Sequence, residues 1–523
     1  MTHPPYQLGL NQQFSSRLAE CCVEAEALKY PKPQLLYFNE KLASQFDANF
    51  PRSDDALAAL FSGQEIPTDA KPIAQAYAGH QFGHFNPQLG DGRAMVLGEL
   101  KNNDGKLFEL DLKGSGPTVF SRGGDGKAAL GPMLREVLIS EAMAAYSVPS
   151  TRSLAVVSTG ETVYRDPPQA GAVLARTSAS QIRIGTFQFF AARDQYDVIK
   201  KLVDFSIERH FPELLLPLMQ HQTNTALAFL NVCISAQAKL IAQWMGLGFI
   251  HGVMNTDNML IGAETIDYGP CAFMDTYDPK TVFSSIDRNS RYAYMNQPSV
   301  TQWNLSRFAE TLLPLIADGI DDGGNRDEDS LKEQAIELAT QAVQSFIPQY
   351  EQTFRLLMCD KLGIDQSLDV DTANLIIDQW QQMLFEQKLD WTLSHYYLTE
   401  HVNTHASDKV SEDATAVKSN AVDAANKLLS ACSNKAAMKE WLTMRQTHSS
   451  KTVEQMKKVN PAIIPRNHLV EEALQLAQKQ GDLSAFNALL TNLQSPFEWP
   501  SDIKYTQPAG QKFNDEFMTF CGT

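Results

Sequence analysis

The hydrophobic pattern of residues 94–113 constrains the fold more than any other feature of the chain. AMVLGEL is followed by the turn NNDG and then by KLFELDLK. In the second run apolar and polar residues alternate, with Phe108, Leu110 and Leu112 set against Glu109, Asp111 and Lys113. A period of two is typical of a half-buried strand, and a short turn between two such runs is typical of a β-hairpin. The sequence therefore predicts a hairpin at this point.

The hairpin belongs to a longer region in which strands alternate with one helix. A Gly-rich loop at 114–131 leads to a predicted helix at 133–146. Pro132 suits its first turn, where the missing N–H is not needed. SLAVVSTGETVYR and AGAVLART predict two further strands.

From about Phe187 onward the pattern becomes mostly helical. The run LNVCISAQAKLIAQWMGLG predicts a strongly apolar helix that ends directly before His251. Polar segments at 318–330 and 404–427 are typical of solvated loops. With 523 residues the chain is too long for one ordinary core, so we expect two or more lobes.

Charge and cysteine content limit the partners and the compartment. The formal net charge is −17, a surface that repels nucleic acid and anionic membranes. We see no run of about 18 apolar residues, so no membrane span is expected. The N-terminus has neither a basic nor an apolar segment of the kind that signal peptides carry. The seven cysteines are scattered and lack paired metal spacing, which favours a reducing, cytoplasmic environment.

The stretch 251-HGVMNTDN-258 carries the first candidate chemistry. A kinase catalytic loop reads His-Arg-Asp, four residues, then Asn, with a metal-binding Asp further on. Laid from His251, this spacing places Asn258 on the Asn and Asp267 on the later Asp, but Val253 occupies the position of the catalytic Asp. Spacing alone therefore indicates metal ligands without the usual base.

Two interpretations of this stretch stay open on spacing alone. Asn258 and Asp267 are oxygen ligands of the kind that Mg²⁺ or Mn²⁺ takes beside phosphate oxygens, and Asp257 could accept a proton from an attacking hydroxyl. His251 would then only brace the loop. Alternatively, the Asn and Asp residues serve turn chemistry after a helix.

Cationic residues in the β-rich region are candidate phosphate ligands. Lys113 ends a predicted strand and either holds phosphates or faces water; Glu136, one turn into the next helix, stands where a kinase-type Lys–Glu pair would place its acid. Arg176 and Arg183 could converge on a phosphate if a bend separates two strands, or could be unrelated surface residues. The short element 89-LGDGR-93 could approach an anion or be a tight turn.

Together these segments resemble the selenoprotein O family, the bacterial YdiU group. The matching motifs cover most of the chain, at 75–99, 111–143, 151–161, 171–188, 248–259, 266–275 and 460–474. The resemblance implies an α+β, protein-kinase-like, two-lobed fold with a β-rich N-lobe and a mostly helical C-lobe. It also implies an N-terminal extension and a C-terminal helical region. We place the boundaries at 1–71 (extension), 72–187 (nucleotide-binding N-lobe), 188–480 (helical C-lobe) and 481–523 (C-terminal tail).

The resemblance also implies an activity and a set of site residues. Family members bind ATP reversed relative to kinases and transfer AMP to hydroxyl side chains of proteins. Asp257 would accept the proton, Asn258 and Asp267 would bind Mg²⁺ or Mn²⁺, and Lys113 would pair with Glu136. The implied nucleotide contacts are Gly90, Gly92, Arg93, Lys113, Asp125, Gly126, Arg176, Arg183 and Asp267. One departure is Gln181, where relatives often carry His.

Reversal of the nucleotide would explain Val253, because the base would be displaced to Asp257. Alternatives are transfer of UMP from UTP with Mn²⁺, transfer of the γ-phosphoryl group by a true kinase, and a nucleotide-binding pseudokinase scaffold without catalysis. Some relatives carry selenocysteine near the C-terminus. We therefore predict a reversible disulfide between Cys271 and Cys521, the alternative being two free thiols.

Overall fold

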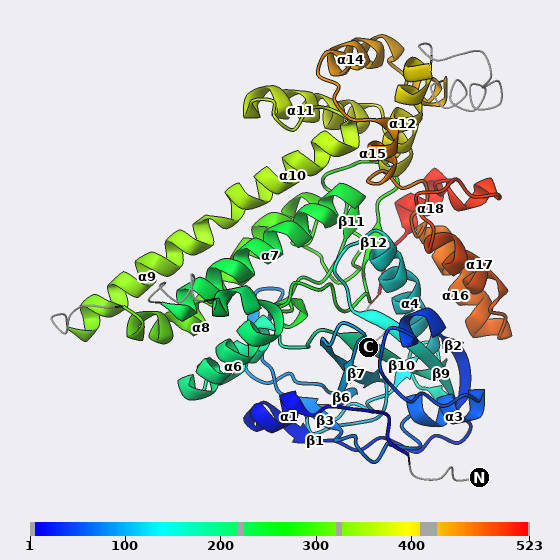
Figure 1. Ribbon diagram of the computed structural model, residues 1–523. Helices are drawn as coiled ribbons and strands as arrows, with labels where there is room; N and C mark the ends of the chain where they lie inside the picture. Colours follow the sequence, from blue (N-terminus) through cyan, green and yellow to red (C-terminus); the bar gives the residue numbers. More distant parts are fainter. Residues whose placement is uncertain (1–5, 217–223, 321–326, 408–425, 521–523) are drawn as a thin grey trace.

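An antiparallel sheet forms one end of the molecule, and helices form the rest (Figure 1). The computed structural model describes residues 6–216, 224–320, 327–407 and 426–520. The strand order is β1-β3-β6-β7-β10-β9-β2, with β8 paired to β10. The strands are β1 Cys22–Glu24, β2 Gln34–Phe38, β3 Ile73–Gln75, β6 Ala94–Lys101, β7 Leu107–Lys113, β8 Ala128–Ala129, β9 Arg152–Val163 and β10 Gln169–Ser178.

The predicted hairpin is confirmed. Strands β6 and β7 pair antiparallel, with Ala94 opposite Lys113. In the turn, the side-chain oxygen of Asn102 accepts hydrogen bonds from the backbone N–H groups of Asp104 and Lys106, and Gly105 has φ +83°. An Asn that bonds to the backbone ahead of it and a glycine with positive φ are typical turn features.

The prediction that β7 is only half buried is wrong. One face of β7, with Leu110 and Leu112, packs into a hydrophobic cluster with α3 (Asp54–Phe61). The other face carries Glu109, Asp111 and Lys113, which are 0%, 0% and 6% exposed. The period of two is real, but α4 (Leu130–Ala145) and the segment around residue 267 cover the polar face.

Residues 1–71 contribute more than a helical and looped extension. Strand β1 pairs with β3 and strand β2 pairs with β9, so this segment supplies both ends of the sheet. Both strands are short and only partly buried, which explains why they left a weak pattern in the sequence. The segment also contains α1 (Gln13–Arg17) and α2 (Glu40–Ala43).

Helix α4 lies on the second face of the sheet. It begins at Leu130, two residues before the predicted opening at Pro132, and Pro is tolerated there because the first four N–H groups of a helix have no partner inside it. On its outer side α4 contacts α16 (Asn467–Gln480) and α17 (Ser484–Leu493), which lie beside it in Figure 1. The C-terminal part of the chain therefore returns to the sheet, and α18 (Gln511–Glu516) follows.

The helical region is built around α7 (Thr225–Leu247). The side chain of Asn224 caps its start, and Gly248, with φ +70°, ends it. Among the described helices, α7 is the one with the length and mean hydropathy of a membrane span, but 56% of that window is buried inside the protein. It contacts α8 (Gln297–Asp318) and α10 (Phe346–Leu362), as a core helix does. Other helices here are α5 Ile184–Ala191, α6 Tyr196–His210 and α9 Glu328–Gln344.

Helices α11 (Val370–Glu386), α12 (Trp391–Ser407), α14 (Lys435–Thr447) and α15 (Val453–Lys457) form a group far from the sheet (Figure 1). Of the two predicted loops, 318–330 separates α8 from α9, although both helices extend into it. The loop predicted at 404–427 is helical up to Ser407, and most of the rest lies outside the described residues.

Two small sheets sit between the large sheet and the helices. Strands β4 (Gly79–Gln81) and β5 (His84–Asn86) form a hairpin, and β11 (Phe249–Ile250) pairs with β12 (Ala272–Phe273). The second pair brackets the segment 251–271, which contains the candidate loop. The β4–β5 hairpin contacts residues 255–257 of that loop.

Candidate active site

A polar cavity of about 120 Å³ lies between the sheet and the loop that follows β11. Four stretches far apart in the sequence line it, so only the folded chain brings these side chains together. Eight of the residues predicted from the sequence are in its wall: Gly92, Arg93, Lys113, Arg176, Arg183, Asp257, Asn258 and Asp267.

Lys113, the last residue of β7, forms the predicted ion pair. Its Nζ lies 2.6 Å from Oε2 of Glu136 and 3.3 Å from Oδ1 of Asp267. Glu136 is on α4, so the pair joins the sheet to the helix. The alternative, a strand-end lysine that faces water, is wrong.

Arg176 extends this network along the sheet. It lies on β10 directly opposite Asp111 of β7, with its Nε 2.9 Å from Oδ1 of Asp111. One terminal nitrogen lies 2.8 Å from Oε1 of Glu136, and the other has no partner among the described residues. Burial alone would raise the pKa of Glu136, but the charges of Lys113 and Arg176 outweigh it and hold that pKa below its ordinary value. Glu136 is therefore ionised and orients both cations toward the cavity.

Asp267 is the carboxylate of the cavity that stays ionised most firmly. Burial would raise its pKa, but the positive charges of Lys113 and Arg93 lower it well below the ordinary value. Its backbone φ is +63°, a left-handed conformation that is uncommon for a residue other than glycine and is often found at functional sites. The carboxylate is thus a permanent anion held against cations.

Asp257 has the opposite electrostatic environment. Burial raises its pKa to about 6, although the nearby Arg183 and a hydrogen bond from Gln81 favour the charged form. Nε2 of Gln81 lies 3.3 Å from Oδ2, and Oδ1 is buried with no hydrogen-bond partner among the described residues. A carboxylate with a free oxygen and a pKa just below neutrality has the properties of a general base.

His251 and Asn258 fix the shape of the loop. The ring of His251 stacks on Trp244, with centroids 5.2 Å apart, and its Nε2 lies 2.8 Å from the carbonyl oxygen of Ile266. His251 therefore braces the loop against the segment that carries Asp267, as the sequence predicts. Nδ2 of Asn258 donates to the carbonyl of Val253, which leaves its amide oxygen without a donor from the described residues.

The donor set fits a hard divalent cation. Asn258 offers an amide oxygen and Asp267 an ionised carboxylate, the oxygen ligands that Mg²⁺ and Mn²⁺ prefer. Within the described ranges no group of three or more His, Cys, Asp or Glu residues has metal-binding geometry. Two protein ligands are nevertheless usual where substrate phosphates and water supply the remaining oxygens.

Arg183 occupies the other side of the cavity, where it contacts residues that sequence reasoning missed. Its guanidinium lies 4.2 Å above the ring of Tyr77 and 3.5 Å from Oδ1 of Asp91, and it donates to the carbonyl of Asp257. Gln181, the residue that departs from the family pattern, accepts from it at 3.2 Å. Tyr77 and Asp91 lie within the matched motif 75–99, but no spacing rule links them to a loop about 170 residues later.

Glu109, next to this site on β7, is a second residue that the sequence did not single out. Its Oε2 accepts hydrogen bonds from Gln75 and from the backbone N–H of Gln181, and its Oε1 has no partner among the residues described. Burial raises its pKa to about 8 even though Arg209 is near. Glu109 is therefore protonated at neutral pH and supports the cavity wall as a neutral group.

Three predicted nucleotide contacts lie outside the cavity wall. Gly90 packs so closely on Phe120 that a Cβ would lie 2.2 Å from the ring. Asp125 pairs with Arg165 at 2.9 Å, and its side chain is 40% exposed. Gly126 accepts a hydrogen bond from the N–H of Gly116 and has φ +66°. These residues shape the Gly-rich loop in this conformation.

The predicted disulfide partner Cys521 lies outside the described residues. Cys271 is a buried free thiol, and burial raises its pKa to about 12. The C-terminal segment does reach this region, because Oγ1 of Thr519 donates to the carbonyl of Pro270 at 2.6 Å. The pairing of the two cysteines stays a prediction.

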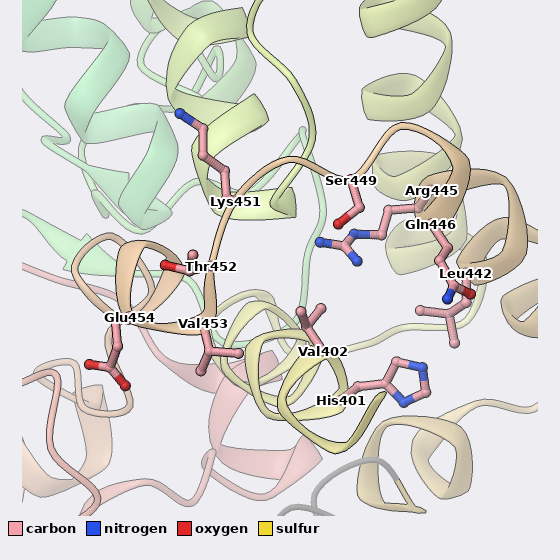
Figure 2. A pocket seen from close by; sticks show the side chains of 10 residues that line it. All are labelled: His401, Val402, Leu442, Arg445, Gln446, Ser449, Lys451, Thr452, Val453 and Glu454. Atoms are coloured by element: carbon pink, nitrogen blue, oxygen red, sulfur yellow. The ribbon is translucent and has the colours of Figure 1, made fainter. Parts of the chain in front are cut away.

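A larger cavity, of about 560 Å³, lies elsewhere, among α12, α14 and the segment that leads into α15 (Figure 2). Its buried Arg445 donates to the carbonyl oxygens of Leu362 and Gly363 at the end of α10. Arginine in that place satisfies the free carbonyls of a helix C-terminus. None of the predicted site residues lines this cavity, so its size does not make it the active site.

Comparison with known proteins agrees with this choice of site. A family model described as "Protein adenylyltransferase SelO" matches residues 5–494. The chain belongs to the SelO family. It is 45% identical to the "Protein nucleotidyltransferase YdiU" of Chromobacterium violaceum over 94% of this chain and 97% of the relative. It is also 44% identical to the protein of that name from Mycolicibacterium smegmatis, over 98% of both chains.

As a SelO-family member the chain is an enzyme, a protein nucleotidyltransferase. Nucleotidyl transfer needs cations around a polyphosphate, an acceptor for a hydroxyl proton and a way to neutralise the leaving group. The cavity around Lys113, Arg183 and Asp257 offers side chains for each of these needs.

Proposed function

We propose that this SelO-family enzyme transfers AMP from ATP to Ser, Thr or Tyr hydroxyl groups of target proteins. The observation that carries the proposal is the convergence of four cationic side chains on one cavity that also holds a free carboxylate oxygen at Asp257. On a chain of net charge −17, such a cluster is a local exception that suits a polyphosphate.

The cations would hold the phosphates of ATP. Arg93, Lys113, Arg176 and Arg183 can surround a polyphosphate from several sides, and paired guanidinium donors match phosphate oxygens. Asn258 and Asp267 would hold Mg²⁺ or Mn²⁺, which when bound neutralises charge on the phosphates. In the reversed orientation that the family resemblance implies, the α-phosphorus lies beside these two residues.

In the transfer step the hydroxyl oxygen of the target forms a bond to the α-phosphorus. The bond from the α-phosphorus to the bridging oxygen of the β-phosphate breaks, and pyrophosphate leaves with that electron pair. Asp257 takes the hydroxyl proton on Oδ1, the oxygen without a partner. Fixed cations that are already in place lower the cost of placing charge on the leaving group.

We further propose that the sheet and the helical region correspond to the two lobes of a protein-kinase-like fold. Three features support this: the antiparallel sheet with α4 on one face, the pair Lys113–Glu136, and the loop 251–267 between the lobes. We also propose that the protein works in the cytoplasm and does not bind nucleic acid or membranes, in keeping with its charge.

UMP transfer is the second candidate. The relatives carry the broader printed name nucleotidyltransferase, which fixes no base, so UTP with Mn²⁺ is the alternative donor. Family membership favours both over a γ-phosphoryl-transferring kinase or a scaffold without catalysis.

One experiment separates these activities. The enzyme is incubated with a protein lysate and with ATP labelled at either the α or the γ phosphorus, and in parallel with α-labelled UTP. Protein-bound α label from ATP supports the proposal, α label from UTP supports UMP transfer, and γ label alone contradicts both.

Two variants test the assigned residues. Asp267→Ala should abolish metal-dependent transfer and Lys113→Ala should weaken ATP use, because each removes a charge from the cavity wall. Lys239→Ala and Asp371→Ala, at exposed helical positions, are matched controls and should keep full activity. Full activity of either cavity variant would contradict the assignment.

A further inference from the structure

A second groove opens directly beside the catalytic loop. Its volume is about 620 Å³, and its wall comes from the β4–β5 hairpin and from the segment 286–300. This groove is larger than the polar cavity and shares none of its lining residues. It is therefore a separate feature that the nucleotide contacts do not use.

The walls of the groove are tied to the loop that carries the proposed base. The backbone N–H of Phe82 and the hydroxyl of Tyr292 both donate to Oδ1 of Asn255, at 3.1 and 2.7 Å. Gln81, which donates to Asp257, is adjacent in sequence to Phe82, so one chain step of about 3.8 Å separates the base from the groove wall. A segment lying in the groove would bring its side chains close to Asp257.

The groove is positively charged on a strongly negative protein. Arg288 and Arg291 line it, and within the described ranges neither has a carboxylate partner. Arg291 instead lies over the ring of Trp303, with its guanidinium carbon 4.7 Å from the centroid. The one carboxylate in the wall, Asp287, accepts hydrogen bonds from the N–H groups of residues 291 and 292. Both guanidinium groups therefore lack a counter-charge within the protein.

Exposed apolar side chains flank these arginines. Ile286, in the wall, is 51% exposed, and the nearby Met295 and Phe85 are 50% and 43% exposed. Large apolar side chains grouped with uncompensated charges at one site are typical of surfaces that bind another protein.

We propose that this groove docks the segment of the target protein that carries the modified hydroxyl, and that it selects segments with acidic residues close to that hydroxyl. The inference rests on the proposed function and adds to it the chemistry of the target. Complementary charge would place the acidic residue on Arg288 and Arg291 and an apolar neighbour on Ile286. A protein segment accounts for both the charge and the apolar surface, whereas a nucleic acid accounts only for the charge.

The test measures transfer of α-labelled AMP to matched synthetic peptides. Each has one Ser, Thr or Tyr at its centre and differs only in flanking residues, which are Glu, Gln or Lys. Wild-type enzyme should prefer the Glu peptides. Arg288→Glu, alone and with Arg291→Glu, should reverse that order, with a change of about fivefold to tenfold in relative kcat/KM. The single variant is included because Arg288 is exposed and leaves the stacking on Trp303 intact.

A matched control carries the same charge change elsewhere. Arg52→Glu with Lys239→Glu alters two exposed cations far from the loop and should keep the wild-type order of peptides. A parallel readout maps modified sites in a lysate by mass spectrometry. Enrichment of Asp and Glu around these sites in wild type, lost in the double variant, supports the proposal.

The outcomes distinguish the docking proposal from the activity. Equal labelling of all peptides together with no acidic enrichment in the lysate overturns the docking proposal and leaves AMP transfer intact. A fluorescent single-stranded oligonucleotide that binds through both arginines, while the peptide order does not change in the variants, also overturns it. Absence of α label on any peptide or protein refutes the proposed function itself, and the docking proposal with it.

Discussion

Gly79 offers the sharpest test of the role given to Asp257. It lies on β4, against the loop, and a Cβ built on it would stand 2.6 Å from Oδ1 of Asp257 and 3.0 Å from its Cγ. Gly79 does not have a positive φ, so alanine is permitted by the backbone and the only penalty is this contact. Gly79→Ala therefore displaces the carboxylate without changing its chemistry.

The expected magnitude follows from the distances. Ordinary contact requires about 3.4 Å, so the carboxylate must move by about 0.8 Å. A misplacement of about 1 Å at a reacting group can cost about 100-fold in rate. We therefore expect kcat for AMP transfer to fall by about 100-fold, equivalent to ~2.7 kcal/mol of activation free energy. The affinity for ATP should change little, because the cations that hold the phosphates are not touched.

The assay combines steady-state transfer of α label with calorimetric titration of ATP and a thermal unfolding scan. Gly510→Ala is the control, since a Cβ there meets nothing within 4 Å and φ is −66°. A Gly79→Ala protein that folds, binds ATP and keeps wild-type kcat would refute the assignment of Asp257 as the base.

Four further predictions follow from the charges and cysteines. In wild type, kcat should fall about tenfold per pH unit below about pH 6, because the pKa of Asp257 is about 6 and the base must be ionised; a flat acid limb in the pH–rate profile would contradict this. Folding raises the pKa of Glu109 from 4.5 to about 8, so the native state holds a proton that the unfolded chain releases. The stability from this group should therefore decline from pH 5 toward 8, and Glu109→Gln should flatten that part of a plot of melting temperature against pH. Arg466→Met should lower the free energy of unfolding by about 3–5 kcal/mol, measured by denaturant titration, since it leaves two buried aspartates without their shared partner. Under oxidising conditions, non-reduced peptide mapping should find a Cys271–Cys521 link, and its absence would remove the disulfide hypothesis.

Local patterns predicted the parts of the molecule whose causes are local. The hairpin 94–113 follows from alternation and an Asn-rich turn, and α7 follows from a long apolar run that a glycine ends. The spacing of His251, Asn258 and Asp267 likewise lies within one loop, and the structure places Asn258 and Asp267 at one cavity. Short edge strands such as β1 and β2 have too few residues to leave a clear period, and they were missed.

The amino-acid sequence determined which side chains alternate on β7 and which residues share a loop, because those relations depend only on a few neighbouring backbone angles. Only the tertiary structure decided that the polar face of β7 is buried, that Tyr77 and Asp91 meet Arg183, and that Asp257 keeps a raised pKa. Burial and pKa depend on what other elements cover a residue. In this protein the covering elements come from parts of the chain more than a hundred residues apart.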